Sequence, residues 1–220
     1  MLDKKSQRRL EGGGINFDVF KNIHRFFSYQ EMPFLRDMIL EMQEKKPLAG
    51  IKIVHHLHLT LSTLCKLEPL VLSGATVDVA LSSQQQVDPV AFELLKQSGI
   101  PIINYEELQD DYDVALDCCA GLLHKITPRL GAVELTRTGS IIYQEANLTY
   151  PVISIDDSEL KEFETKFGTG DGFLRGLGAF YPGELAKKRF LVFGYGKVGR
   201  GIIYQLKEFT RDIVVVDPDE

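Results

Sequence analysis

The stretch that decides the fold lies near the end of the chain and reads FLVFGYGKVGRGIIYQLKEFTRDIVVVD, from Phe190 to Asp217. A short apolar run, FLVF, leads into a Gly-x-Gly-x-x-Gly sequence whose glycines are Gly194, Gly196 and Gly199. Apolar residues then recur at helical spacing, and a second apolar run, IVVV, ends at the aspartate. The order of strand, glycine turn, helix, strand and acid predicts a βαβ unit.

Each glycine has a separate mechanical role in a turn that binds a dinucleotide. Gly194 permits the tight turn, Gly196 lets the backbone approach a pyrophosphate, and Gly199 lets the helix lie against the strand. The pyrophosphate then lies at a helix N-terminus, where free N–H groups and the helix dipole favour an anion. The alternative is a glycine-rich turn that binds nothing. The predicted cofactor-binding residues of this loop are Gly194, Tyr195, Gly196, Lys197, Val198 and Gly199.

The aspartate that ends the second apolar run predicts which dinucleotide binds. Asp217 follows Gly199 by 18 residues, close to the interval of about 20 at which an acid accepts hydrogen bonds from ribose hydroxyls. A carboxylate there repels a 2′-phosphate, so we expect NAD rather than NADP. The sequence ends three residues later. Because a complete dinucleotide-binding domain has two βαβαβ halves, we expect the chain to be truncated at its C-terminus.

Composition bounds the class of protein. The chain has 220 residues, of which 44% are hydrophobic, enough for a core in one large or two small domains. Its 25 basic and 31 acidic residues give a formal charge of -6, which argues against nucleic acid as a partner. No apolar run reaches the roughly 18 residues of a membrane span, and the N-terminus does not have the pattern of a signal peptide. Three cysteines without disulfide or metal spacing predict a cytoplasmic location.

Strand and helix patterns alternate through the rest of the chain, which predicts an α/β, Rossmann-like fold with a mostly parallel sheet. We expect a flexible tail over 1–14, a substrate-type α/β domain over 15–182 and the first βαβ unit of an NAD domain over 183–220. Expected helices are 17–44 with a break at 32–33, 60–72, 89–97, 161–168 and 173–180. Expected strands are 51–55, 76–81, 101–104, 113–116, 140–143 and 152–155, and 124–133 is expected to be helical or irregular.

Histidines cluster at the end of the first expected strand, at His55, His56 and His58. The second and third alternate onto one face of an extended segment, but no carboxylate or cysteine lies at ligand spacing nearby. We therefore expect no metal and interpret the cluster as a strand end entering a cleft, with His58 as its functional residue. Cys118 and Cys119 are adjacent, which disfavours a mutual disulfide, and we expect both to be buried as small apolar residues.

Several short segments, taken in order, resemble the S-adenosylhomocysteine hydrolase (adenosylhomocysteinase) family. Their order and spacing carry the resemblance, which runs from about Glu31 to the end of the sequence. The segments are EMP at 31–33, KPLAG at 46–50, LHLT at 57–60, GATV at 74–77, SGIP at 98–101, the stretch 131–139, PVI at 151–153 and GYGKVG at 194–199.

The resemblance implies a chemistry as well as a fold. In this family a tightly bound NAD oxidises the 3′-hydroxyl of the substrate ribose, which acidifies the neighbouring C4′–H. Homocysteine is eliminated, water adds, and the same NADH reduces the ketone. Such a site needs proton-transferring groups near the 3′ oxygen and C4′. The resemblance also implies a small-molecule substrate and a homo-oligomer in the full-length form.

The residues that the family uses carry over only in part. His58 and Thr60 match a histidine and a threonine near the substrate, and Asp117 matches the first of two aspartates. Thr136 and Thr138 match two of three threonines that face the cofactor. From these matches we predict a catalytic histidine, substrate-binding residues Thr60 and Asp117, and two cofactor-binding threonines.

A lysine followed by Phe-Asp-Asn in the family corresponds here to Lys161 and then Phe163, Glu164 and Thr165, with one residue fewer between. We predict catalytic roles for the lysine and the glutamate and a cofactor contact for the threonine. The alternative for Lys161 is a solvated helix face.

Three family acids are replaced in this chain. Ser62 stands for a glutamate, Cys118 for the substrate-facing aspartate and Leu135 for the catalytic glutamate. A leucine cannot transfer a proton, and a thiol does not anchor sugar hydroxyls. The pocket is therefore expected either to take another substrate or to have lost catalysis.

Three functions remain open at this point. The first is an adenosylhomocysteinase-like protein that acts, in its full-length form, on S-adenosylhomocysteine or a related small molecule. The second is a non-catalytic NAD-binding paralog with a regulatory surface, and the third is an NAD-dependent dehydrogenase with another substrate. The replaced acids favour the second and third, whereas the family resemblance favours the first over the third. We expect the 220-residue chain alone to be inactive.

Overall fold

The computed structural model describes residues 14–181 and 183–218. The predicted flexible tail lies, apart from Gly14, outside the described residues. Contacts divide the chain into two compact units, unit 1 up to Ser154 and unit 2 from Ile155. This division falls ahead of the expected domain boundary at 182–183, because the helices between Glu164 and Phe180 pack against the helix of the βαβ unit.

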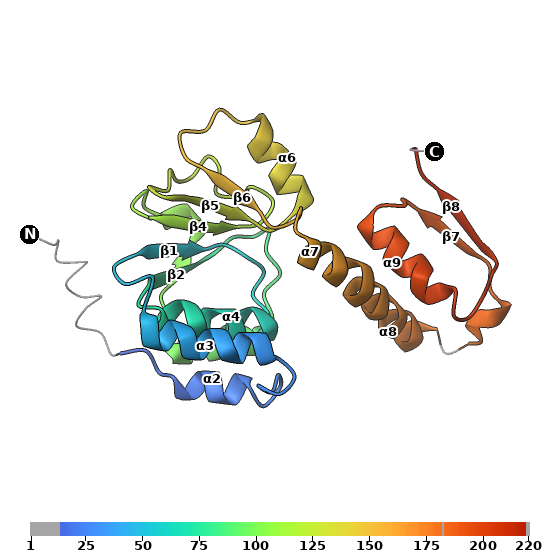
Figure 1. Ribbon diagram of the computed structural model, residues 1–220, viewed down its shortest axis with the longest axis horizontal. Coiled ribbons are helices and arrows are strands. Elements are labelled where there is room, and N and C mark those ends of the chain that lie inside the picture. The colour runs from blue at the N-terminus through green and yellow to red at the C-terminus, as the bar shows by residue number, and fades with distance from the viewer. Residues whose placement is uncertain (1–13, 182, 219–220) are drawn as a thin grey trace, which may run out of the picture. The chain divides into compact units, whose positions relative to one another are not determined.

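Unit 1 is built on a six-stranded parallel sheet in the order β3-β2-β1-β4-β5-β6 (Figure 1). The predicted α/β class with a parallel sheet is therefore confirmed. The strands are β1 (Lys52–His55), β2 (Thr76–Leu81), β3 (Ile102–Asn104), β4 (Val114–Asp117), β5 (Gly131–Glu134) and β6 (Val152–Ser154). The helices are α2 (Asp18–Ile23), α3 (Pro33–Lys45), α4 (Leu61–Leu72), α5 (Pro89–Ser98), the 3-10 turn η1 (Tyr105–Glu107) and α6 (Arg137–Glu145).

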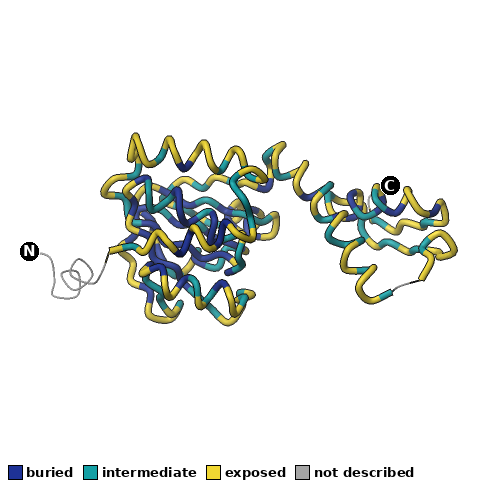
Figure 2. Tube along the Cα trace, turned by 90° about the horizontal axis from the view of Figure 1, so that it is seen from below, coloured by how far each residue is buried: buried dark blue, intermediate teal, exposed yellow. Residues whose placement is uncertain are grey.

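The sheet of unit 1 is covered on both faces, and Figure 2 shows buried residues concentrated in the interior of this unit. Successive residues of a strand point to opposite faces. Ile53 of β1 accordingly joins a cluster with Leu67 of α4 and Leu95 of α5, whereas the next residue, Val54, joins a second cluster with Tyr112. Burial on both faces explains why the strands are apolar runs rather than alternating ones.

Short polar signals fix where the helices of unit 1 begin. Thr60 accepts a hydrogen bond from the Thr63 amide at the start of α4, and Asp88 accepts one from the Ala91 amide at the start of α5. Side-chain acceptors at these positions satisfy amides that have no partner within the helix. The helix α5 ends at Gly99, whose φ of 79° is left-handed.

Three stretches differ from the sequence prediction. The helix expected from 17 to the break at 32–33 ends early, because α2 stops at Ile23 and residues 24–32 form turns. There the His24 ring contacts the Phe27 carbonyl and the buried Glu68 carboxylate, and neither contact belongs to a helix. The expected strand 140–143 is wrong, because these residues belong to α6, which Thr136 caps by accepting from the Gly139 amide. The expected helical or irregular segment 124–133 instead ends in strand β5, which pairs with β4 and β6. The errors at 124–133 and 140–143 have separate causes. A short strand buried inside a sheet has no alternating pattern, and Ile141 and Ile142, which are β-branched and favour strands, lie on a helix.

Unit 2 contains the predicted βαβ unit. Strands β7 (Phe190–Phe193) and β8 (Ile213–Val216) pair in parallel, and α9 (Lys197–Leu206) connects them. Helical segments also precede β7 in this unit, and the two between Glu164 and Phe180 pack against α9. The segments before β7 are α7 (Glu159–Phe163), the π-helical η2 (Glu164–Thr169), α8 (Gly170–Phe180) and the short 3-10 turn η3 (Leu185–Lys187).

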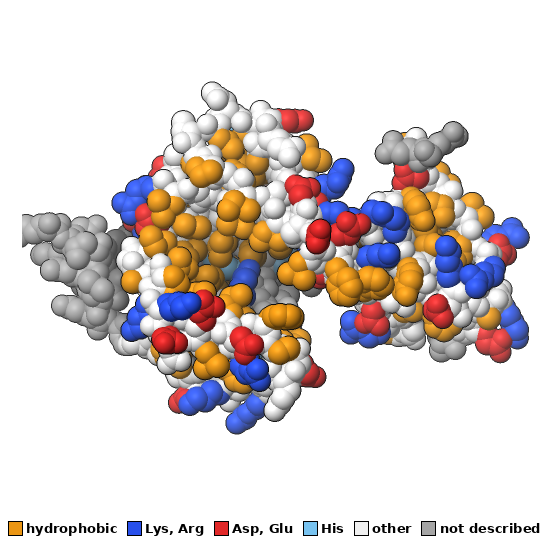
Figure 3. All heavy atoms as spheres, viewed as in Figure 1, with side chains coloured by type: hydrophobic (Ala, Val, Ile, Leu, Met, Phe, Trp, Pro, Cys, Tyr) orange, Lys and Arg blue, Asp and Glu red, His pale blue; other side chains and the backbone are white. Residues whose placement is uncertain are grey.

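The surface of both units carries basic and acidic side chains interspersed on the face that Figure 3 shows. No helix within residues 14–181 and 183–218 is both long enough and apolar enough to cross a membrane.

The core of unit 1 provides a test of the fold. Leu95→Ala removes a fully buried side chain of α5, and we expect the free energy of unfolding of this unit to fall by about 2–5 kcal/mol. Val90→Ala, on the same helix but 52% exposed, should change it by less than about 0.5 kcal/mol. Hydrogen exchange of β2 as a function of urea assigns the transition to unit 1. Equal losses in the two variants would contradict this packing.

Candidate functional site

The carboxyl edge of the unit 1 sheet forms a pocket of about 770 Å³. In the strand order, β1 and β4 are neighbours whose connections lead to opposite sides of the sheet. The crevice outside the carboxyl ends of such a pair is where open α/β sheets bind their ligands. Residues from loops after four strands line this pocket, among them His56, Ser82, Asn104, Tyr105, Cys119 and Gly121.

The carboxylate of Asp117, the last residue of β4, is fully buried at this edge. One oxygen accepts from the Cys118 amide at 2.8 Å and faces Nδ1 of His56 at 3.0 Å. The other accepts from the Leu122 amide at 2.9 Å and from the Tyr143 hydroxyl at 2.7 Å. Burial and the adjacent carboxylate raise the pKa of Tyr143 far above its usual value, so its hydroxyl remains a donor. Four donors from three segments therefore surround one carboxylate.

A second buried carboxylate, that of Glu134, fixes the loop after β4. It accepts from the amides of Cys119 and Ala120, each at 3.0 Å, and from the Thr136 hydroxyl at 2.6 Å. The two amides belong to residues with φ values of 59° and 53°, both left-handed. Non-glycine residues adopt this conformation at a cost, which the carboxylate contacts offset. The loop is therefore held rigidly against the pocket.

The adjacent cysteines lie differently from the expectation that both are buried. Cys118 is buried, but Cys119 is exposed and borders the pocket. Their sulfur atoms are 3.8 Å apart. The left-handed backbone at Cys119 turns its side chain outward, which a sequence pattern of two adjacent residues does not reveal.

The predicted substrate residues His58 and Thr60 both form hydrogen bonds within unit 1. His58 is exposed, and its Nδ1 accepts from the Gln86 amide at 3.0 Å. The hydroxyl oxygen of Thr60 caps α4 and lies 2.9 Å from that of Ser62. The carboxylate of Asp117 is fully buried at the carboxyl edge of the sheet, where it faces the four donors given above. The catalytic and binding roles of these residues stay predictions.

The predicted cofactor threonines of unit 1 lie at the start of α6. Thr136 is the N-cap and donates its hydroxyl to Glu134, whereas Thr138 is exposed in the first turn. Leu135, which replaces the family glutamate, is partly buried, and its amide donates to the Asp117 carbonyl.

His56 is the pocket residue that the sequence analysis passed over in favour of His58. It is 3% exposed, lines the pocket and faces Asp117, 61 positions along the chain. The alternation of histidines at the strand end was a usable signal. Choosing between them required the partner, which only the pairing of β1 with β4 brings close.

Two basic side chains lie near the carboxyl end of β1 without an expected role. His55 is fully buried, and within the described residues neither ring nitrogen has a hydrogen-bond partner. Burial holds the pKa of His55 well below its usual value, and the charge of Lys66 on α4 lowers it further. Burial also lowers the pKa of Lys66 to about 8. An ammonium that loses water is disfavoured relative to the neutral amine.

The glycine loop of unit 2 has the geometry that the motif predicts. Gly194 has a φ of 94°, and an added Cβ at Gly199 would meet the Gly194 carbonyl oxygen at 2.0 Å. An added Cβ at Gly196, the N-cap of α9, would meet nothing within 4 Å. The first and third glycines are thus required by the fold, whereas the second leaves open space at the start of the helix.

Asp217 follows β8 and accepts a hydrogen bond from the Tyr195 amide, so the acid and the glycine loop lie side by side. A pocket of about 640 Å³ adjoins them and is lined in part by Ile203, Val215 and Arg211.

The remaining predicted residues of unit 2 bond to other side chains of the same unit. Lys161 and Glu164 form an ion pair of 2.9 Å, and the Thr165 hydroxyl donates to the same glutamate at 3.1 Å. Lys197, inside the glycine motif, donates to the buried carboxylate of Asp156 at 3.0 Å. The pairing of the first two residues agrees with either a site role or a helix-surface ion pair.

Comparison with known proteins adds to this geometry. No family model matches the chain. The adenosylhomocysteinase of Sulfurisphaera tokodaii is 30% identical over 214 residues, which cover 84% of this chain and 51% of that protein. Those of Pyrococcus abyssi and Aquifex aeolicus are 30% and 31% identical over 86% of this chain. Over 84–86% of its length the chain is similar to adenosylhomocysteinases. It spans about half the length of the adenosylhomocysteinases that it matches.

The lowered pKa of Lys66 predicts a pH dependence of stability. Between its folded pKa of about 8 and the ordinary value of 10.5, the unfolded chain binds more protons at this lysine than the folded one. The free energy of unfolding should therefore gain a contribution as the pH rises through this window. Urea unfolding from pH 7 to 10 should show this gain relative to Lys66→Met.

Lys96→Met provides the matched control, because Lys96 lies on α5 with its side chain 51% exposed. Its curve should run parallel to that of the wild type. A Lys66→Met curve that also runs parallel to the wild type would contradict the buried amine.

Proposed function

We propose that the chain is the substrate-side domain and the first nucleotide-binding unit of an adenosylhomocysteinase-like protein that binds NAD. The observation that carries the proposal is the glycine turn of unit 2. It combines a left-handed Gly194, an open Gly196 at a helix N-terminus and Asp217 against the same loop. These residues fit a dinucleotide, since the open side of the second glycine leaves room for a pyrophosphate.

In this proposal the loop from Gly194 to Gly199 holds the pyrophosphate, and Asp217 accepts from the adenosine ribose. The family resemblance supports contacts from Thr136, Thr138 and Thr165 to the cofactor. Bound NAD supplies a hydride acceptor for oxidation of a substrate hydroxyl. The chain's own residues then have to bind the sugar and move protons at neighbouring atoms.

Proton-transferring groups are only partly retained on the substrate side. His58 is an exposed imidazole near the edge, and Lys161 with Glu164 forms an amine–carboxylate pair that can hold a proton. Thr60 is the proposed substrate-side anchor. The resemblance implies a second anchor at Asp117, but the carboxylate of that residue is fully buried and already faces four donors. Against them, Leu135 and Cys118 stand where the resemblance implies acids. In this proposal the substrate is S-adenosylhomocysteine or a related small molecule, and the two replaced acids weaken catalysis.

The replaced acids also favour a second function. A paralog without catalysis could keep the NAD-binding loop as a structural or regulatory element, and a dehydrogenase with another substrate is the remaining alternative. Homo-oligomerisation, a role in one-carbon metabolism and a cytoplasmic location belong to the proposal as well. They rest on the family and on the cysteine pattern of the sequence.

Cofactor preference tests the role of Asp217 and of the open glycine. We expect the chain to bind NAD more tightly than NADP in isothermal titration, with weak affinity, because the carboxylate repels a 2′-phosphate. Gly196→Val should abolish NAD binding and leave the circular dichroism spectrum unchanged, since the added side chain fills only the open space. Gly176→Val, on α8 with nothing within 4 Å, is the control and should bind NAD. Equal affinities for the two dinucleotides, or NAD binding by a folded Gly196→Val variant, would overturn the assignment.

Hydrolysis of S-adenosylhomocysteine tests the substrate side. We expect no useful turnover by this chain with NAD, because loss of one positioned acid–base group typically costs about 10² to 10⁴ in rate. Homocysteine release can be followed with a thiol reagent after subtracting the signal of the protein's own cysteines. Robust turnover would show that Leu135 and Cys118 are tolerated. Recovery of activity in a Leu135→Glu, Cys118→Asp variant would point to a degraded hydrolase site.

A further inference from the structure

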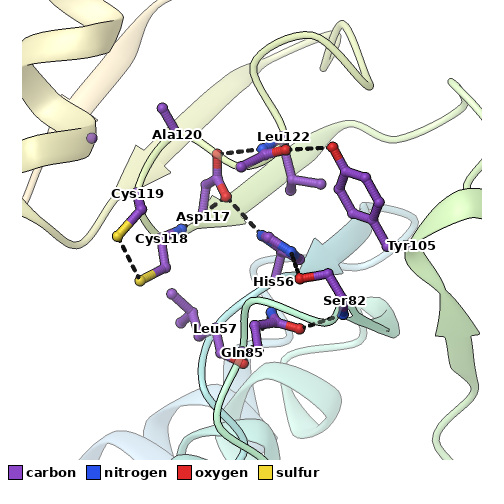
Figure 4. Close-up of polar contacts among 12 residues, drawn as sticks. His56, Leu57, Ser82, Gln85, Tyr105, Asp117, Cys118, Cys119, Ala120 and Leu122 are labelled. Carbon is purple, nitrogen blue, oxygen red and sulfur yellow. Dashed lines mark hydrogen bonds and ion pairs between the residues drawn. The ribbon is translucent and has the colours of Figure 1, made fainter.

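At the pocket of unit 1 a serine, a histidine and an aspartate form one hydrogen-bonded series (Figure 4), in which Ser82 and His56 line the pocket and Asp117 lies buried behind them. Nδ1 of His56 lies 3.0 Å from Oδ1 of Asp117, and Nε2 of the same ring lies 3.3 Å from Oγ of Ser82. The aspartate and histidine are 0% and 3% exposed, whereas the serine lines the pocket. We propose that Ser82, His56 and Asp117 form a nucleophilic acyl-transfer site that is separate from NAD chemistry.

The aspartate determines which ring nitrogen carries the hydrogen. Its carboxylate is surrounded by donors, namely two backbone amides and the Tyr143 hydroxyl, and it acts as the acceptor in each bond. Nδ1 of His56 is therefore the N–H that points at Asp117. Nε2 is left with its lone pair toward Ser82, whose hydroxyl donates to it. A nucleophile bonded to a base, with the base oriented by a buried acid, is the arrangement that activates a serine.

The imidazole is fixed by the loop after β4. An added Cβ at Gly121 would lie 2.5 Å from Cε1 of His56, so only glycine lets the loop close on the ring. The Tyr105 ring lies 5.4 Å from the imidazole between centroids, and its hydroxyl donates to the Gly121 carbonyl at 2.7 Å. These contacts restrict the base to one orientation.

The serine is fixed from the other side by Gln85. The Ser82 amide donates to the Gln85 side-chain oxygen at 2.8 Å, and the side-chain amide of Gln85 donates to the Leu57 carbonyl at 3.3 Å. The loop after β2 is thereby tied to the loop after β1, which keeps nucleophile and base together.

The pocket wall indicates the class of substrate. Phe92, Ile102 and Ile103 give it an apolar side, and among its described lining residues there is no arginine or lysine to attract an anion. An uncharged ester with a small apolar acyl group fits this lining. Asn104 also lines the pocket and pairs in register with Leu81, the residue before Ser82. Its side-chain amide is the group that we assign to the developing oxyanion.

The reaction balances without a cofactor. Oγ of Ser82 attacks the ester carbonyl while Nε2 of His56 takes the hydroxyl proton, and that proton then passes to the leaving alkoxide as the C–O bond breaks. Water attacks the resulting acyl-serine, giving its proton to the same nitrogen, and the carboxylic acid and free serine are released. Asp117 stabilises the imidazolium in both steps and positions the ring.

The test uses the full 220-residue chain without NAD. A biotinylated fluorophosphonate should label Ser82, as mapped by mass spectrometry of the digest, and p-nitrophenyl butyrate should be hydrolysed. Ser82→Ala should lose the label and slow hydrolysis by about 10²-fold or more. His56→Gln should give a similar loss. Ser83→Ala changes the exposed neighbouring serine and should retain both signals.

Several results would overturn the proposal. They are an unlabelled wild type with no hydrolysis, label on Ser83 or on Cys119, or a folded Ser82→Ala variant that hydrolyses the ester as fast as the wild type. Because no dinucleotide is present, failure here leaves the NAD-binding proposal standing, and failure of NAD binding leaves this site unaffected.

Discussion

The buried carboxylate of Asp117 is the interaction on which the functional edge of unit 1 depends. Four donors reach it, from the His56 ring, the Cys118 and Leu122 amides and the Tyr143 hydroxyl. These groups come from β1, the loop after β4 and α6, so a single charge joins the two halves of the sheet where the strand order reverses. A carboxylate at this depth is tolerated only because every side of it meets a donor. The pocket wall and the orientation of His56 follow from that requirement.

Much of the fold could be read from local signals. The βαβ unit of unit 2 follows from two apolar runs around a glycine turn, and α5 from Asp88, Pro89 and Gly99 at its ends. The sequence pattern did not predict that α2 ends at Ile23, and it missed β5 and α6. A four-residue strand buried between two others carries no period, and the helix holds two isoleucines that resemble a strand. Pairing with neighbouring strands, which lies outside any local window, determined both.

The residues of the candidate site also fall into those that sequence spacing predicted and those that it did not. The glycine loop and Asp217 were identified from spacing, and the structure brings them together. The roles of Lys161 and Glu164 came from family resemblance, and these two side chains pair with each other. His58 was chosen from the strand-end pattern as well, and it accepts from the Gln86 amide, 28 residues away. His56 was missed because its partner is 61 residues away. The architecture agrees with the similarity to adenosylhomocysteinases, whereas the residues around the pocket distinguish this chain from what the resemblance implies.

The two units lead to separable chemistry. Unit 2 offers a loop that fits a dinucleotide, and unit 1 offers a pocket whose acids differ from those that the family resemblance implies. The central claim is that the Gly194–Gly199 loop binds NAD. Two-dimensional NMR of the ¹⁵N-labelled chain tests it most directly, by following backbone amides as NAD is added. NAD binding at this loop predicts chemical-shift changes concentrated at the amides of Tyr195, Gly196, Lys197, Val198 and Asp217. Shifts absent from these amides at millimolar NAD, or confined to unit 1, would contradict it.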